Sequence, residues 1–213
     1  NAYIWMLPPI PWTMTLWTDK QKIKSLMTKI VLTLALLLTA ILTNGQDFET
    51  LYKKLETFKV FTEFDSVDRE ILVACDYVLS KPLMREKQTK EYYYAIKSMV
   101  KWMNNTESYR ILIFGKVIES THGDPLMQNM FMASMGKYLL EQRYNHNRHV
   151  FPVKQPNVNY GDVPEVKETL LEGAKIFFDY LKNTSGEKPN KELKNGIKAF
   201  DNGTLEEYMF KKT

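Results

Sequence analysis

Apolar side chains recur three and four residues apart along almost the whole chain from Asp47 onward. This spacing places them on one face of an α-helix, and no stretch shows the sustained alternation that a half-buried strand requires. The sequence therefore predicts an all-α fold of about seven or eight helices in a single domain over residues 46–213. The expected helices begin near residues 47, 66, 86, 106, 124 and 162. A shorter helix is expected to carry Leu193, Ile197 and Phe200 and to end at Gly203, and an amphipathic turn follows near residue 205.

Two architectures fit this spacing. The first five helix starts are about 20 residues apart, so two helices would form a hairpin of about 40 residues, which is within the range of helical-repeat proteins. The tetratricopeptide pattern is absent, however, and no two segments align residue for residue. The sequence leaves open a short stack of helical hairpins and an irregular helical bundle.

Residues with capping side chains indicate where three of these helices begin. Ser66 is the expected N-cap of the second helix, and Thr106 is the expected N-cap of the fourth. Asp124 followed by Pro125 predicts an N-cap with proline at the first helical position, where the missing N–H costs nothing. The fourth helix is expected to bury one face, formed by Tyr109, Leu112, Ile113 and Val117.

Residues 27–45 have the features of a signal peptide. A short basic start at Met27 to Lys29 precedes 13 predominantly apolar residues, 30–42, and small or polar residues then lead to Gln46. A helix of that length rises about 20 Å, which is too short for a hydrocarbon core of about 30 Å. We expect export to the periplasm or outside the cell, with only transient membrane contact. A buried helix or a membrane anchor is the alternative.

Residues 1–26 differ from the rest of the chain. They hold three of the four tryptophans and three prolines, show no helical or strand period, and begin with Asn1. We expect translation to begin at Met27, so that residues 1–26 come from an over-extended reading frame. The alternative is an aromatic segment that lies on a membrane surface, since tryptophan favours the headgroup region.

The charge distribution argues against a nucleic-acid partner. Of the net charge of +4, residues 1–45 carry +3 from four lysines and one aspartate, which leaves 25 basic and 24 acidic side chains in the remainder. A nucleic-acid-binding protein concentrates positive charge on one surface, whereas the two signs alternate here. The single cysteine, Cys75, excludes an intramolecular disulfide and a cysteine-rich zinc site.

The least helical stretch, residues 144–163, contains the best candidate binding residues. Long loops in compact domains are often functional, and aromatic, arginine and asparagine side chains are typical of interfaces. We expect a binding edge for a protein or a glycan, formed by Tyr144, His146, Arg148, His149 and Tyr160. His146 and His149 would share one side of a helical turn, but zinc needs three or four ligands and only Asp162 offers a third. We therefore expect no metal and no cofactor.

The loop STHGD brings together residue types of a hydrolase. Ser120, His122 and Asp124 lie within five residues. A nucleophile must be held within hydrogen-bond reach of its base, and neighbours in one short loop seldom achieve this geometry. Because Asp124 is already explained as a helix cap, we do not expect a catalytic triad here.

Methionine and tyrosine clusters point to packing. Met127, Met130, Met132 and Met135 share one helix, and thioethers can bind a soft metal or form an adaptable groove. Met132 lies about 160° from Met130 around that helix, so we expect core packing instead of one ligand cluster. Residues 92–94 are three tyrosines that cover nearly a full turn, so at least one ring must lie at a second contact or in solvent.

Three segments carry a resemblance to known proteins: DREILVACDYVLSKP at 68–82, AIKSMVKWM at 95–103 and KELKNGIKAFDNGTLEEY at 191–208. They resemble small secreted all-helical bacterial proteins that have a signal peptide and no assigned activity. The resemblance implies export and a helical fold. It carries over no catalytic residue.

These observations together predict an exported helical protein that acts by binding another macromolecule, without catalytic activity. The alternative is a small exported hydrolase or metal-dependent enzyme, with its site near His122 or in the loop at residues 144–163.

Overall fold

The computed structural model describes residues 47–86, 88–152 and 158–211. The chain divides into two units, residues 1–46 and residues 47–213, and the description below concerns the second. The predicted signal peptide and the segment before it lie outside the described residues, so both remain expectations.

The described residues form α-helices and two short 3-10 helices and contain no strand, which confirms the predicted all-α fold. The α-helices are α2 (Phe48–Thr57), α3 (Phe61–Phe64), α4 (Asp68–Leu79), α5 (Lys90–Asn105), α6 (Lys116–Ser120), α7 (Pro125–His146), α8 (Pro164–Asn183), α9 (Lys191–Asp201) and α10 (Leu205–Phe210). The 3-10 helices are η1 (Asp65–Val67) and η2 (Tyr160–Asp162).

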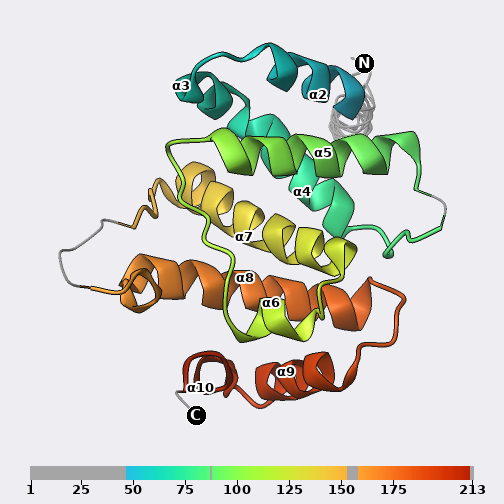
Figure 1. Cartoon of the computed structure of the whole chain (residues 1–213), viewed down its shortest axis with the longest axis vertical. Helices are drawn as coiled ribbons and strands as arrows, with labels where there is room; N and C mark the ends of the chain where they lie inside the picture. The colour runs from blue at the N-terminus through green and yellow to red at the C-terminus, as the bar shows by residue number, and fades with distance from the viewer. Residues whose placement is uncertain (1–46, 87, 153–157, 212–213) are drawn as a thin grey trace, which may run out of the picture. The chain divides into compact units, whose positions relative to one another are not determined.

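Within residues 47–213 the longer helices pack in the order α2, α5, α4, α7, α8, α9 (Figure 1). The short helices α6 and α10 pack against each other and against α9. This spatial order departs from the chain order, because α5 lies between α2 and α4. The structure is therefore an irregular helical bundle, and not a simple stack of consecutive hairpins.

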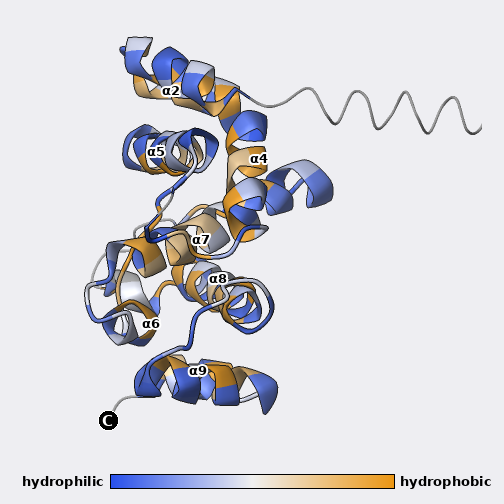
Figure 2. Cartoon of the chain, turned by 90° about the vertical axis from the view of Figure 1, so that its right-hand side faces the viewer, coloured by the Kyte–Doolittle hydropathy of each residue, from blue (hydrophilic) through white to orange (hydrophobic). Residues whose placement is uncertain are grey.

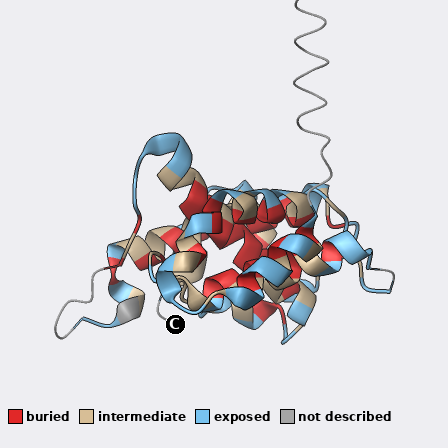
Figure 3. Ribbon diagram, turned by 90° about the horizontal axis from the view of Figure 1, so that it is seen from above, coloured by how far each residue is buried: buried red, intermediate tan, exposed pale blue. Residues whose placement is uncertain are grey.

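Helix α7 lies in the middle of the bundle and is buried around its whole circumference. Seven consecutive residues, 130–136, are all buried. Helices α4, α5 and α8 all pack against α7. Figure 3 shows the buried residues toward the middle of the bundle, with exposed segments around them. All four methionines of α7 are buried, as predicted, and Met130 and Met132 both pack internally because α7 has neighbours on opposite sides.

The outer helices α2 and α9 each bury only one face. Their hydrophobic residues turn toward the neighbouring helices and their hydrophilic residues turn outward (Figure 2). On α2 the apolar spacing predicts a buried stripe of Phe48, Leu51, Tyr52, Leu55 and Phe58, and three of these residues, Phe48, Leu51 and Leu55, are buried. The apolar spacing predicts two further stripes, and both are buried in full. The first is Val67, Ile71, Ala74, Cys75 and Val78, from η1 into α4, and the second is Val166, Leu170, Ala174, Phe177 and Leu181 on α8.

Of the predicted N-caps, Asp124 is confirmed and Ser66 is wrong. Asp124 accepts hydrogen bonds from the backbone N–H groups of Leu126 and Met127 at 3.0 and 3.3 Å, with Pro125 at the first helical position, as expected. Ser66, by contrast, does not cap α4. It lies inside η1 and donates its hydroxyl to the Glu63 carbonyl oxygen at 2.6 Å, because the chain is already helical from Phe61 onward.

The helix expected from Thr106 is absent. Residues 106–114 run as an irregular segment, and only α6 follows, after Gly115 with a φ of 87°. The Thr106 hydroxyl does not cap a helix, because it donates to the Asp65 carboxylate at 2.8 Å, 41 residues earlier in the chain. Tyr109 is buried against another element, and Ile113, expected on the inner face, is exposed. Tertiary contacts therefore override the apolar spacing of this segment.

Helices α7 and α8 approach each other closely at Gly173. A Cβ atom at this position would lie 2.5 Å from Met135 Cγ and 3.2 Å from Met135 Cα. The methionine side chain can rotate away, but the backbone Cα cannot. The close contact between the two longest helices therefore requires a residue without a side chain on α8.

We expect Gly173→Ala to destabilise the protein by roughly 1–3 kcal/mol, because overpacking outweighs the higher helix propensity of alanine. Chemical denaturation monitored by circular dichroism measures this change. Asp179→Ala, at an exposed position of the same helix, is the control and should change stability by less than about 0.5 kcal/mol. Equal stability of both variants would contradict the close approach of α7 and α8.

Candidate functional site

A buried carboxylate joins the ends of three helices. Asp68, the first residue of α4, is only 1% exposed. Its two oxygens accept hydrogen bonds from the Trp102 indole N–H of α5 at 2.9 Å, from the Tyr109 hydroxyl at 3.0 Å and from the Tyr144 hydroxyl of α7 at 3.3 Å. We call these four residues the Asp68 cluster.

Other side chains surround the Asp68 cluster. The His149 ring packs edge-to-face on Tyr109 with 5.5 Å between ring centroids, and the Arg69 guanidinium lies 5.1 Å from the centre of the Tyr144 ring. His149 Nε2 is 2.6 Å from the Ser108 carbonyl oxygen. Because a carbonyl oxygen only accepts, this nitrogen carries the hydrogen.

Burial dominates the electrostatics of the Asp68 cluster. Desolvation raises the pKa of Asp68 to about 6, although the hydrogen bonds from Tyr109 and Trp102 favour the charged form. Desolvation, together with the nearby Asp68 charge, also raises the pKa of Tyr109. The two carboxylate oxygens are engaged by three donors of the chain itself. The cluster is therefore arranged to hold α4, α5 and α7 together.

Three residues of the predicted binding edge make contacts with other parts of the same chain. Tyr144 and His149 meet at the Asp68 cluster, as described above. Arg148 forms a two-pronged ion pair with the Glu168 carboxylate of α8, in which Nη2 lies 2.5 Å from Oε2. His146 is exposed at the end of α7, and Tyr160 begins η2.

His146 and His149 do not share a helical turn. Helix α7 continues to His146, into the stretch from residue 144 that is expected to be least helical, and stops because Asn147 adopts a left-handed conformation with a φ of 51°. His149 then lies outside the helix, where it contacts the Ser108 backbone. In the part of the chain that the structure describes, no three histidine, cysteine, aspartate or glutamate side chains come close enough to hold a metal ion.

Ser120, His122 and Asp124 of the STHGD loop do not hydrogen-bond to one another as a catalytic triad would. The Ser120 hydroxyl donates to the Val117 carbonyl oxygen at 2.8 Å, and His122 Nε2 lies 3.2 Å from the Glu192 carboxylate. Asp124 caps α7 and pairs with Arg85 at 2.6 Å. Each of the three side chains therefore has its own separate partner.

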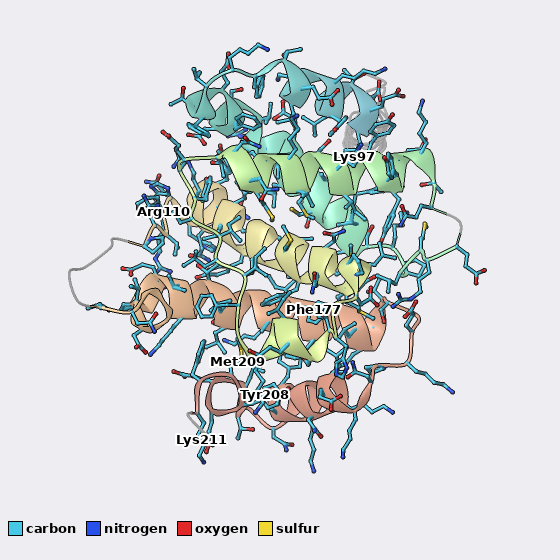
Figure 4. All side chains as sticks on the ribbon, viewed as in Figure 1. Lys97, Arg110, Phe177, Tyr208, Met209 and Lys211 are labelled. Carbon is cyan, nitrogen blue, oxygen red and sulfur yellow. The ribbon has the colours of Figure 1, made fainter. Side chains whose placement is uncertain are left out.

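A groove of about 540 Å³ lies along α5. Figure 4 labels Lys97, one of the α5 residues that line it. This volume is typical of ligand sites in proteins. Helix α5 supplies most of the lining, one residue comes from α2, two come from α7 and one comes from the connector before α5. The lining residues are Tyr52, Gln88, Tyr93, Ile96, Lys97, Val100, Lys101, Asn104, Asn105, Leu126 and Asn129. We call this feature the α5 groove.

Two aromatic rings hold a lysine in the α5 groove. The Lys97 ammonium lies 4.7 Å from the centre of the Tyr52 ring and 5.0 Å from that of Tyr93, within the range of cation–π attraction. The Tyr52 ring also has Lys101 Nζ at 5.7 Å. The pKa of Lys97 is raised, mainly by its hydrogen bond to Tyr93, so this side chain stays charged.

The sequence contained a partial signal for this site. Tyr92 is fully buried and Tyr93 is 43% exposed, which confirms that the tyrosine triplet places at least one ring outside the core. The α5 residues of the groove recur at the spacing of one helical face, at positions 93, 96, 97, 100, 101, 104 and 105. The contributions of Tyr52 and Asn129 could not be foreseen, because they come from other helices.

No family model, curated protein or solved structure in the comparisons matches this chain. Over the described residues, no helix combines the length and the apolar character needed to cross a membrane.

The Asp68 cluster predicts a pH-dependent stability. The folded-state pKa of Asp68, about 6, is above its ordinary value, so the folded protein holds this proton more tightly than the unfolded chain. The contribution of this group to stability is therefore greatest when it is protonated and is lost as the pH rises through about 6. Urea denaturation between about pH 4 and pH 7 measures it.

We expect Asp68→Asn to remove this component, so that the difference in unfolding free energy between wild type and variant falls as the pH rises. Asp179→Asn, at an exposed aspartate, serves as the control. Parallel pH dependences for wild type and Asp68→Asn would contradict the assignment.

Proposed function

We propose that this chain is an exported helical protein that acts by binding another macromolecule through the α5 groove. The single observation that carries the binding proposal is the groove itself. It combines a volume typical of ligand sites with tyrosine, lysine and amide side chains on one helical face.

A rigid support favours this helix as a binding platform. Tyr92, Met99 and Trp102 are fully buried on the inner side of α5. The Trp102 indole is fixed further by its hydrogen bond to Asp68. The groove residues therefore project from a helix that the core holds in place, and little conformational freedom is lost when a ligand binds.

Export rests on the pattern of residues 27–45 and on the resemblance to secreted helical proteins. Expression of the full chain in a bacterial host tests it. We expect mass spectrometry of the exported product to find Gln46 at the mature N-terminus, because the signal peptidase cleaves after the small residue Gly45. Recovery of an uncleaved precursor from the cytosol would contradict export.

A combined glycan and peptide array tests the binding proposal. Tyr93→Ala removes the most exposed ring of the groove, and loss of a central aromatic anchor should weaken binding by roughly 2 kcal/mol. Lys194→Ala on the exposed face of α9 is the control, and should leave the array profile unchanged. Circular dichroism verifies that both variants fold. An identical profile for wild type and Tyr93→Ala would contradict binding through this groove.

A further inference from the structure

We propose that the α5 groove recognises an oligosaccharide that carries carboxylate groups, such as a chain of uronic acids. This inference rests on the proposed function and names the class of ligand that the groove takes. Three features of the lining support it: charge, amide chemistry and exposed ring surfaces.

The charge of the groove selects an anion. Lys97 and Lys101 lie one turn apart on α5, and both ammonium groups lie over the same Tyr52 ring, at 4.7 and 5.7 Å. None of the lining residues carries a carboxylate. Two positive charges therefore converge on one end of the groove without an acidic lining residue to neutralise them. A carboxylate placed there would accept charge-assisted hydrogen bonds.

The amide side chains select hydroxyl groups. Four amides line the groove: Gln88, Asn104, Asn105 and Asn129. Asn105 already donates one N–H to the Lys101 carbonyl oxygen at 2.7 Å. Each amide offers a donor and an acceptor side by side, which matches a pair of neighbouring sugar hydroxyls, since each hydroxyl both donates and accepts. The backbone groups of α5 are used within the helix, so the side chains must provide the hydrogen bonds to a ligand.

The apolar part of the lining fits sugar rings. Tyr93 is 43% exposed, and the half-buried Val100 and Leu126 add aliphatic surface beside it. The C–H face of a sugar ring is apolar and flat, so it can cover an exposed tyrosine ring while its hydroxyls reach the amides. An acidic peptide would share the charge, but it would need partners for its own backbone N–H and C=O groups. The helix-lined groove provides these only through the same amides.

Isothermal titration calorimetry with three probes tests the inference: an oligogalacturonate, a neutral cello-oligosaccharide and an oligoglutamate of equal length. We expect the oligogalacturonate to bind most tightly, and added salt to weaken it because exposed charges are screened. Lys97→Gln keeps most of the side chain and removes the charge. It should weaken oligogalacturonate binding roughly tenfold or more. Lys194→Gln on α9 should leave the affinity unchanged.

Four other outcomes would overturn the inference in distinguishable ways. Tighter binding of oligoglutamate, lost in Lys97→Gln, would identify an acidic protein as the partner and leave the proposed binding function intact. Equal binding of the neutral and charged sugars, unaffected by Lys97→Gln, would retain a glycan site and remove the carboxylate specificity. Absence of binding for all three probes would overturn the inference, and the array would then decide separately whether the groove binds another ligand. Binding that is unaffected by both Tyr93→Ala and Lys97→Gln would overturn the groove and the proposed function together.

Discussion

Helix α7 is surrounded by other helices, and the rest of the bundle is arranged to cover it. Its buried residues occupy every side, so α7 cannot lie at a surface without exposing apolar area to water. Helices α4 and α5 cover one part of it and α8 covers another. The contact with α8 is tight because Gly173 brings the backbones together at Met135. Methionines suit this position, since their flexible thioethers fill irregular gaps between several neighbours.

The Asp68 cluster connects α4 to α5, to the segment after α5 and to α7 at one end of these helices. A buried carboxylate is costly unless it is hydrogen-bonded, and Asp68 has three donors from α5, from the segment after it and from α7. The raised pKa of Asp68 shows that desolvation still outweighs these hydrogen bonds. The cluster instead fixes the path of the chain. The hydrogen bond from Tyr109 to Asp68 holds the irregular segment at residues 106–110 against α4.

The position of the α5 groove follows from the same packing. Because Trp102 and Met99 anchor one side of α5 in the core, the opposite side faces outward between α2 and α7. Two of its residues, Tyr52 and Lys97, are 45 positions apart in the sequence and meet only because α2 packs on α5. A protein with this arrangement offers a preformed surface of fixed charge and ring orientation, which is what selective recognition of a polar ligand requires.

The sequence by itself determined the features that depend on neighbouring residues. The stripes of α4 and α8 and the start of α7 at Asp124–Pro125 follow from helical periodicity and capping, which act within a turn or two. The tertiary structure alone decided the irregular path of residues 106–114, the burial of Asp68 and the assembly of the groove. In each case the deciding partner is distant in sequence, as with Thr106 and Asp65. Where a helix forms, local spacing predicts most of its buried residues. It does not predict which residues meet one another, because that depends on how whole helices pack.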